Sequence, residues 1–566
     1  MSSRLPKTPE ALLGWDWAQF EPLVRELLAR PLDAGSAADW LQDWSDVQAA
    51  LVELYNRLYL ATAINTADAA ATQAYTAYIE EIFPQSMEAD QALRQKLLDS
   101  GVEPPGFEVA LRNMRAETAL YRAENLALLA EEQKLSNEFD KITGAQTVEW
   151  DGREVTVTQL RAALQEHDRE RREQAWRLKI GRQQADRASL DELWVRCIQV
   201  RLKLAANAGQ PDYRAYRWQQ LLRFDYTPED CLHFQEAIEA EVVPAAQRAC
   251  ERRRQRLGLS SLRPWDLDVD PLGRPPLRPY RSDGELKEKA AAIFQHVDPQ
   301  LGAYFRQMVA ENLLDLDNRK NKAPGAFCTD LPVTRRPYIF MNGVGLHEDA
   351  QTLLHESGHA FHAFESNAIT LMMLQQAPME FAEVSSIGME LLAGPYLEER
   401  YGGFYSASDA ARARAEHLES ALLFWPYMAV VDAFQHWVYA HPAEACDPAQ
   451  CDAAWSRLYR RFLPWEDWSG LEELLATGWQ RKLHIFQVPF YYVEYGLAQL
   501  GAAQVWRNAL RDPADAVARY RQALALGGSV ALPQLYEAAG ARLAFDRETL
   551  GEAVRLMEEK MIALAA

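Results

Sequence analysis

The chain has 566 residues, of which 48% are hydrophobic and 25% charged, a composition typical of a globular protein with one or more large cores. Its formal net charge of −21 argues against nucleic acid or an anionic membrane as a partner, because both are bound by basic surfaces. No apolar run approaches the roughly 20 residues that span a bilayer, and neither an apolar leader nor a dense cysteine pattern indicates secretion, so we expect a cytoplasmic protein.

The first part of the chain is predicted to be helical. Apolar residues recur at spacings of three and four over 38–64, 69–82 and 107–140, with breaks expected at Pro84 and at 104–106. A β-hairpin is expected over 147–157, where two alternating runs flank Asp151-Gly152-Arg153. Helices resume from Thr158 to about 207, and the charged run 167–173 is expected to be a solvated helix face. We place the boundary between an N-terminal helical lobe, 1–205, and a catalytic region, 206–566, beside the break at 209–212.

The pattern changes between residues 318 and 345. Residues 325–329 and 337–342 are predicted to form short strands, after which the chain is helical almost to its end. An exposed edge of these strands could bind an extended peptide as an added strand. A buried packing strand would have the same sequence pattern, so both interpretations stay open.

Residues 354–362, Leu-His-Glu-Ser-Gly-His-Ala-Phe-His, contain an H-E-x-x-H motif in a segment of helical character. Residues four apart lie on one helix face, so His355 and His359 can offer two imidazole nitrogens to one zinc ion. Glu356 can then act as the general base toward a water on that ion. Asp349 is the expected N-cap of the helix. The alternative is a chance match on a core helix, which the scarcity of histidine disfavours, since the chain has 11.

A catalytic zinc site needs a third protein ligand and one position open to water. His362 shares the helix face, but in an unbroken helix it lies a turn beyond the ion, so it is expected to be a supporting or core histidine. The acidic candidates are Glu365, Glu380, Glu383 and Glu390, of which the last three lie near one face of a predicted helix over 379–392. Spacing alone does not decide which of these acids is the third ligand.

A second candidate site is the aromatic segment 484–496, which begins at His484. Peptide hydrolysis places negative charge on the carbonyl oxygen, and a tyrosine hydroxyl or a histidine N–H aimed at that oxygen lowers the barrier. If the segment is helical, Tyr492 and Tyr495 project from one face. Aromatic residues at this spacing are more often part of a core, so the segment by itself indicates packing.

The run 355–362, followed by Phe-Ala-Glu-Val-Ser-Ser-Ile-Gly-Met-Glu over 381–390, resembles the oligoendopeptidase F and thimet oligopeptidase family of zinc peptidases, most closely its Pz-peptidase branch. Shorter matches at 223–227, 242–244, 262–266 and 323–328 and the C-terminal tyrosines extend the likeness over most of 210–530. The family's F-x-E motif matches 381–383, so the resemblance implies Glu383 as the third ligand, with Glu390 supporting the site and Glu380 as the fallback. It also implies that His484 and two tyrosines contact the substrate, which we assign as Tyr492 and Tyr495, with Tyr491 an open alternative to Tyr492.

The resulting prediction is a mostly α, two-lobed zincin-type metallopeptidase with a small β-sheet beside the active-site helix. The resemblance further implies a central channel that admits oligopeptides and excludes folded proteins. We expect one Zn²⁺ per chain, held by His355, His359 and Glu383, and an endopeptidase mechanism in which Glu356 deprotonates the attacking water. The alternatives are a related zinc carboxypeptidase and a helical peptide-binding protein without catalysis.

Overall fold

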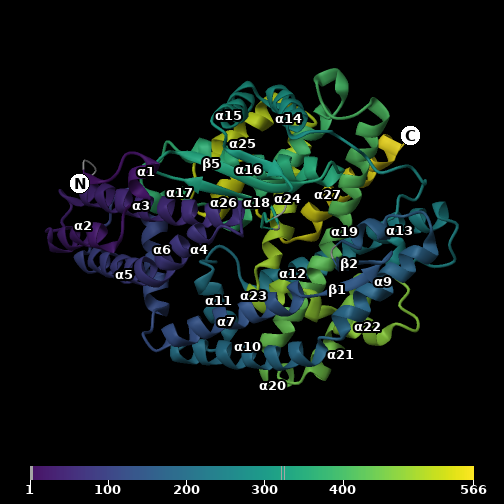
Figure 1. Cartoon of the computed structure of the whole chain (residues 1–566), viewed down its shortest axis with the longest axis horizontal. Helices are drawn as coiled ribbons and strands as arrows, with labels where there is room; N and C mark the ends of the chain where they lie inside the picture. Colours follow the sequence, from purple (N-terminus) through teal and green to yellow (C-terminus); the bar gives the residue numbers. More distant parts are fainter. Residues whose placement is uncertain (1–3, 158, 320, 324, 566) are drawn as a thin grey trace. The chain divides into compact units, whose positions relative to one another are not determined.

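The computed structural model describes residues 4–157, 159–319, 321–323 and 325–565 (Figure 1). Thr158 and Pro324, which fall in a predicted helix and in one of the matched segments, lie outside the described residues. The fold is mostly helical with two small sheets, which confirms the predicted fold class. The chain forms two compact units, each assembled from three segments: unit 1 is Met1–Thr118, Pro276–Arg414 and Leu497–Leu543, and unit 2 is Ala119–Pro275, Ala415–Gly496 and Ala544–Ala566. The expected division at 205/206 stays a prediction.

Unit 1 contains an N-terminal group of helices, a three-stranded sheet and the helices that follow the sheet. Its elements are α1 (Pro9–Leu12), α2 (Trp17–Ala29), α3 (Ala37–Ile64), α4 (Ala69–Ala77), η2 (Tyr78–Ile82), α5 (Phe83–Ser100), α6 (Glu108–Leu120), α14 (Asp283–Val297), α15 (Pro299–Ala310), β3 (Leu314–Asp317), β4 (Phe327–Leu331), β5 (Arg336–Gly343), α16 (His347–Ser366), α17 (Met372–Gln375), α18 (Met379–Ala393), η5 (Gly394–Tyr396), η6 (Glu399–Tyr401), α25 (Pro513–Leu524) and α26 (Leu532–Ala538).

Unit 2 is helical apart from one hairpin. Its elements are α7 (Asn125–Gly144), β1 (Thr147–Trp150), β2 (Arg153–Thr156), α8 (Arg161–Leu164), α9 (Arg169–Gln184), α10 (Arg187–Asn207), α11 (Tyr213–Gln220), α12 (Pro228–Ala237), η3 (Ile238–Val242), α13 (Val243–Arg256), η4 (Pro264–Asp266), α20 (Pro442–Ala445), α21 (Pro448–Phe462), α22 (Glu472–Ala476), η7 (Thr477–Arg481), α23 (Leu483–Gln487) and α27 (Arg547–Ala565). The long helices α19 (Ala407–Ala440) and α24 (Tyr492–Ala509) contribute residues to both units, as do the last residues of α6.

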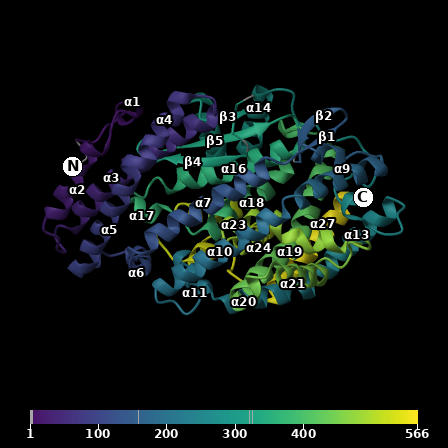
Figure 2. The same cartoon turned by 60° about the horizontal axis from the view of Figure 1, so that its bottom comes forward.

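The predicted helices are largely present, but one of them is interrupted. The segment 107–140 breaks between α6 and α7, where the side chains of Arg122 and Asn125 donate to the carbonyls of Ala208 and Leu204 at the end of α10. This break carries no Pro or Gly signal, because it depends on contacts with another element. The helices expected from 158 to about 207 are α8, α9 and α10. The helices α7 and α10 pack side by side (Figures 1 and 2).

The hairpin prediction is confirmed. Strands β1 and β2 pair antiparallel, with Thr147 opposite Thr156 and Trp150 opposite Arg153. The turn residues Asp151 and Gly152 both have positive φ, 50° and 73°, as a two-residue turn with a right-handed twist requires.

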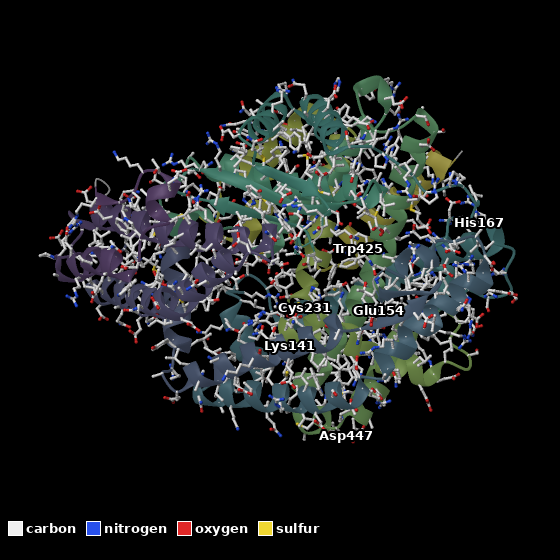
Figure 3. The ribbon with its side chains drawn as sticks, viewed as in Figure 1. Lys141, Glu154, His167, Cys231, Trp425 and Asp447 are labelled. Carbon is white, nitrogen blue, oxygen red and sulfur yellow. The ribbon has the colours of Figure 1, made fainter. Side chains whose placement is uncertain are left out.

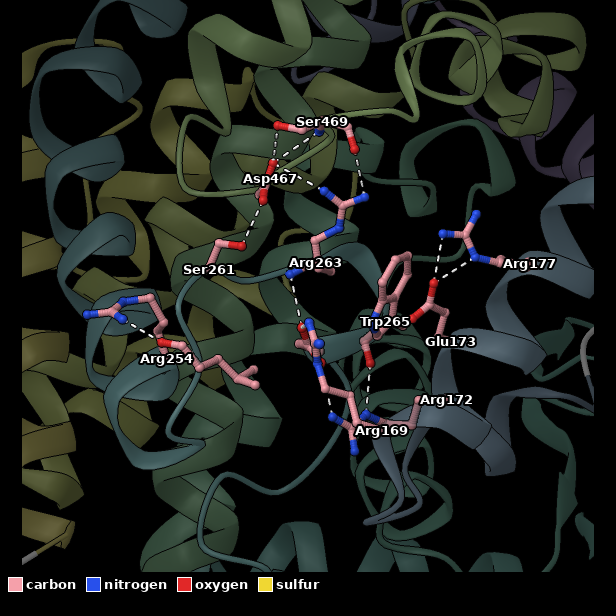
Figure 4. Close-up of polar contacts among 12 residues, drawn as sticks. Arg169, Arg172, Glu173, Arg177, Arg254, Ser261, Arg263, Trp265, Asp467 and Ser469 are labelled. Carbon is pink, nitrogen blue, oxygen red and sulfur yellow. Dashed lines mark hydrogen bonds and ion pairs between the residues drawn. The ribbon is translucent and has the colours of Figure 1, made fainter.

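The charged run 167–173 is not a simple solvated face, which corrects the expectation. Arg172 is buried in unit 2 and, together with Arg169, donates to the buried carboxylate of Asp266 at 2.8–3.0 Å. Arg172 also donates to the Trp265 carbonyl (Figure 4). The segment just before Trp265 is fixed by a hydrogen bond from the Ser261 hydroxyl to the Asp467 carboxylate. A buried carboxylate is tolerated here because several donors satisfy it.

The sheet of unit 1 has the order β3–β5–β4, with β3 parallel and β4 antiparallel to the central strand β5. Strands β4 and β5 were predicted and β3 was not, since its four residues are too short for a clear alternation. The edge strand β4 packs against α3, and Asn56 of α3 donates to the Asp330 carbonyl at 2.7 Å. Helix α16 packs against β4 and β5 (Figures 1 and 2). The sheet thereby supports the helix that carries the H-E-x-x-H motif.

Asp349 lies in the first turn of α16 and not at its N-cap, which is Leu346. Its Oδ2 nevertheless accepts hydrogen bonds from the backbone N–H groups of Val344 at 2.8 Å and Leu346 at 2.7 Å, and from the Tyr280 hydroxyl at 2.6 Å. The carboxylate reaches back over the helix start and joins it to the end of β5. The predicted capping function is therefore present, from a position inside the helix.

We predict that Asp349→Ala destabilises unit 1 by about 2–3 kcal/mol, because two backbone donors lose a charged acceptor. Asp349→Asn keeps one oxygen at the same place, so its free energy of unfolding should fall by less than half as much as that of Asp349→Ala. Urea unfolding followed by helical circular dichroism measures both. Equal stability of Asp349→Ala and wild type would contradict this account of the helix start.

Candidate active site

Two helices of unit 1 bring the three predicted metal ligands together. His355 and His359 lie one turn apart on α16, and Glu383 faces them from α18. The Nε2 atoms of His355 and His359 lie 3.4 and 3.8 Å from Glu383 Oε2. Ligand atoms about 2.0–2.1 Å from a tetrahedral ion are separated by about 3.3–3.5 Å, so this donor set fits zinc. Both imidazole side chains remain 23–27% exposed, so the site is accessible.

Gly358, inside the motif, allows the two helices to approach backbone to backbone. A Cβ added at this residue would lie 2.6 Å from the Ser385 carbonyl oxygen and 2.6 Å from Ser386 Cα. These are backbone atoms of α18, which cannot move aside as a side chain would. The Tyr520 hydroxyl of α25 donates to the same Ser385 carbonyl at 2.6 Å. The close approach places Glu383 within reach of both histidines.

Further side chains orient the ligands. Glu390 Oε1 lies 2.7 Å from His355 Nδ1, and a proton on Nδ1 leaves the Nε2 lone pair free for a metal. Ser386 donates to Glu383 Oε2 at 2.9 Å. The family resemblance predicted a supporting role for Glu390, whereas no sequence motif predicted the roles of Ser386 and Gly358. The only sequence signal for these two was a run of small residues on each helix.

The electrostatics of the group favour a bound cation. Burial opposes ionisation of Glu383, but hydrogen bonding to His355 and the two imidazoles hold the pKa of its carboxyl below the ordinary value. Burial lowers the pKa of His359 to about 4, so this imidazole is in the neutral form that binds metals. Burial also disfavours charge on His355, yet Glu383 and Glu390 raise its pKa well above normal. The two carboxylates therefore attract positive charge to the place that an ion would occupy.

Glu356 lies beside the ligands and is 7% exposed. Burial raises the pKa of its carboxyl to about 7, although the adjacent His355 and a hydrogen bond from the Cys328 backbone N–H act in the opposite direction. Cys328 belongs to the edge strand β4, so the sheet and the helix together position this carboxylate. A carboxylate with this pKa is suited to accept and return a proton near neutral pH.

The other ligand candidates lie outside the group. His362 is buried, its ring centroid lies 6.1 Å from that of Phe381, and burial lowers its pKa to about 4. This placement is the core position expected for it. Glu365 is ion-paired with Arg521 at 2.7 Å. Within the described residues, the metal-competent group on α16 and α18 contains Glu383 and neither Glu365, Glu380 nor Glu390.

The aromatic segment of unit 2 forms a compact cluster. The His484 ring lies 4.7 Å from Tyr492 and 6.1 Å from Tyr495, centroid to centroid, and Tyr491 lies 5.3 Å from Tyr495. Tyr492 is buried, with Lys482 Nζ 4.0 Å from its ring centroid, whereas Tyr491 and Tyr495 are half-buried. Burial and the charge of Lys482 lower the pKa of His484 to about 4, so its ring is neutral. The structure gathers all four side chains and leaves the choice between Tyr491 and Tyr492 open.

The sequence profile of peptidase family M3 matches residues 162–554, more than half of the chain. The chain belongs to peptidase family M3. This membership confirms the predicted enzyme class, a metalloendopeptidase of the oligopeptidase type, and the resemblance on which it was based. Within the part of the chain that the structure describes, no helix of this M3 peptidase is long and apolar enough to cross a membrane.

Individual relatives agree with this assignment. The structure of PZ peptidase A, solved with an inhibitor, is 26% identical, with a TM-score of 0.87 over 100% of this chain and 99% of that one. A putative oligoendopeptidase F is 27% identical, with a TM-score of 0.87 over 97% of both chains. The oligopeptidase PepF of Bacillus subtilis (strain 168) is 23% identical over 271 residues, which are 46% of this chain and 39% of that protein.

We predict that Gly358→Ala weakens metal binding at least tenfold and lowers the thermal unfolding midpoint, because α16 and α18 must separate by a few tenths of an ångström or more. Gly388→Ala is the matched control: it is also a helical glycine, on α18, but its added Cβ would meet Tyr520 at an ordinary 3.4 Å. Chelator competition measures the affinity, and calorimetry measures the stability. Metal affinity equal to wild type in Gly358→Ala would show that the close approach is unnecessary.

Proposed function

We propose that this M3 peptidase is a zinc-dependent endopeptidase that cleaves internal bonds of short oligopeptides. The observation that carries the proposal is the convergence of two imidazoles and a carboxylate on one point, with the buried carboxylate of Glu356 beside them. His355, His359 and Glu383 would hold one zinc ion. When bound there, zinc supplies Lewis-acid chemistry that makes water a nucleophile at neutral pH and polarises the scissile carbonyl.

The protein's own contribution to bond cleavage centres on Glu356. Its carboxylate accepts a proton as water attacks the carbonyl carbon, and the same oxygen later donates that proton to the leaving amine nitrogen. The pKa of about 7 suits both steps, because neither protonation state is strongly disfavoured near neutral pH. The Cys328 backbone N–H holds the carboxylate in place between the two transfers.

The aromatic cluster of unit 2 supplies the remaining candidates. We propose that Tyr492, Tyr495 and His484 donate hydrogen bonds to the carbonyl oxygen as it becomes negative, a contribution of about 3–4 kcal/mol for one good donor. The neutral state of His484 leaves it one N–H to donate. Oligopeptides are the proposed substrates. The cytoplasm, and the absence of nucleic-acid and membrane partners, stay predictions based on the charge of −21 and the composition.

We predict that Glu356→Gln binds zinc with wild-type stoichiometry and loses turnover by a factor of about 10²–10⁴, because only the proton acceptor is removed. Glu383→Ala should instead lose zinc affinity. The assay is hydrolysis of an end-blocked, internally quenched peptide about ten residues long, before and after chelation and the return of zinc.

Normal turnover by Glu356→Gln would refute the assigned base. Cleavage confined to peptides with a free C-terminus would indicate a carboxypeptidase, and stoichiometric zinc without any cleavage would favour the peptide-binding protein. Glu380→Gln is the matched control for both variants. Glu380 is a buried carboxylate on α18, like Glu383, but it lies outside the ligand group.

We predict that Tyr495→Phe lowers kcat by about 10²–10³ and changes KM and zinc content little, because a hydroxyl that stabilises the oxyanion acts mainly in the transition state. Tyr491→Phe, the half-buried neighbour, is the comparison. A loss confined to Tyr491→Phe would move the donor role to that residue. A rise in KM alone in Tyr495→Phe would indicate substrate binding and no role in the chemical step.

A further inference from the structure

A second group of metal-ligand side chains lies in unit 2, on helices that carry none of the proposed zinc ligands. Cys231 belongs to α12, and Asp432 and His436 lie one turn apart on α19. Their candidate ligand atoms, Sγ, a carboxylate oxygen and an imidazole nitrogen, all lie within 4.8 Å of one another. Figure 3 shows Cys231 within the ribbon of the unit and the exposed Asp447 at its edge. The spacing of these three residues in the sequence does not predict the group.

All three side chains are removed from solvent: Cys231 and Asp432 are 0% exposed and His436 is 4% exposed. His436 Nε2 lies 3.6 Å from Asp432 Oδ2, too far for a hydrogen bond of ordinary length. Within the described residues, neither ring nitrogen of His436 has a hydrogen-bond partner, and neither does Asp432 Oδ1. Each buried polar atom without a partner destabilises the folded state, so native proteins rarely keep three of them together.

The surroundings hold the group in place, but the described residues offer no partner to the His436 ring or to Asp432 Oδ1. The His436 ring packs against the rings of Trp218, at 6.0 Å, and Phe490, at 5.1 Å, which offer no acceptor in place of a ligand. Gln235, one turn after Cys231 on α12, donates to Asp432 Oδ2 at 2.7 Å. This bond orients the carboxylate, as residues that support metal ligands do. The nearby cation Arg223 is ion-paired with Glu494 at 2.6 Å.

The donor types suit zinc. Thiolate, imidazole and carboxylate are the ligands that Zn²⁺ takes in proteins. A thiolate, a carboxylate and a neutral imidazole around one divalent ion sum to zero charge, which removes the main cost of burying ionised groups. The separations up to 4.8 Å exceed the roughly 3.3–3.7 Å expected around a tetrahedral ion, so binding would draw the three side chains inward.

We propose that Cys231, Asp432 and His436 bind a second, structural Zn²⁺. The two histidines of the proposed catalytic site are 23–27% exposed, whereas all three side chains of this group are buried, so no peptide reaches this ion. Its position suggests what it stabilises. Phe490, in contact with His436, has a left-handed φ of 63°, and its N–H donates at 2.6 Å to Gln435, the neighbour of His436. Phe490 directly precedes the tyrosine segment, so the ion would stiffen the support of that segment.

The metal content of purified protein tests the proposal independently of catalysis. We expect two zinc ions per chain in wild type and one in the double variant His355→Ala/His359→Ala, which disables only the proposed catalytic site. Adding Cys231→Ala to the double variant should remove the remaining ion. Cys451→Ala, at another buried cysteine of the same unit, is the matched control and should keep it.

A spectroscopic measurement needs no change at the new site and so does not depend on the folding of Cys231→Ala. The double variant, produced in cobalt-supplemented medium, should show a thiolate-to-cobalt charge-transfer band in the near ultraviolet, since the proposed catalytic ligands include no sulfur. Absence of that band together with no bound metal in the double variant would overturn the proposal. The proposed peptidase mechanism would stand in that case, and a failure of the mechanism would leave this test unaffected.

Discussion

The backbone contact between α16 and α18 at Gly358 is the constraint on which the proposed catalytic site depends. Two histidines on one helix do not by themselves fix the position of a metal ion. The third proposed ligand comes from a neighbouring helix and must lie opposite both histidines. With any larger residue at 358, the backbone of Ser385 and Ser386 could not lie where it does. Helix α16 packs against the sheet and against α25, and α25 is joined to α18 by the hydrogen bond from Tyr520 to Ser385.

The same region shows how burial tunes acid–base chemistry without unusual residues. Glu356 and Glu383 are buried carboxylates close to each other on adjoining helices, yet the pKa of one is raised to about 7 and that of the other is lowered. Glu383 faces two imidazoles and a serine hydroxyl, whereas Glu356 receives little besides one backbone N–H. Their environments differ in the way that the proposed roles of ligand and base require.

Unit 2 contains a different use of buried polar groups. Asp266 is satisfied by arginines that the sequence pattern assigned to solvent, and Arg223 is paired with Glu494. Among the described residues, both ring nitrogens of His436 and one carboxylate oxygen of Asp432 have no hydrogen-bond partner, and the proposed second ion would satisfy them. Buried polar side chains thus support the fold where hydrogen bonds satisfy them, as at Asp266. Where polar atoms lack partners among the described residues, as at His436, the side chains are candidate metal ligands.

The sequence by itself determined the features that local chemistry encodes. The H-E-x-x-H helix, the hairpin turn at Asp151 and Gly152, and the strands β4 and β5 follow from residue spacing and turn preference, which act within a few residues. The family resemblance predicted Glu383 as the third metal ligand, whereas spacing alone could not distinguish it from Glu380 and Glu390. Only the tertiary structure showed the helix break before Asn125, the buried position of Arg172, and the role of Asp349 inside the first turn. It alone brought Cys231 to Asp432 and His436, because no local rule relates residues so far apart in the chain.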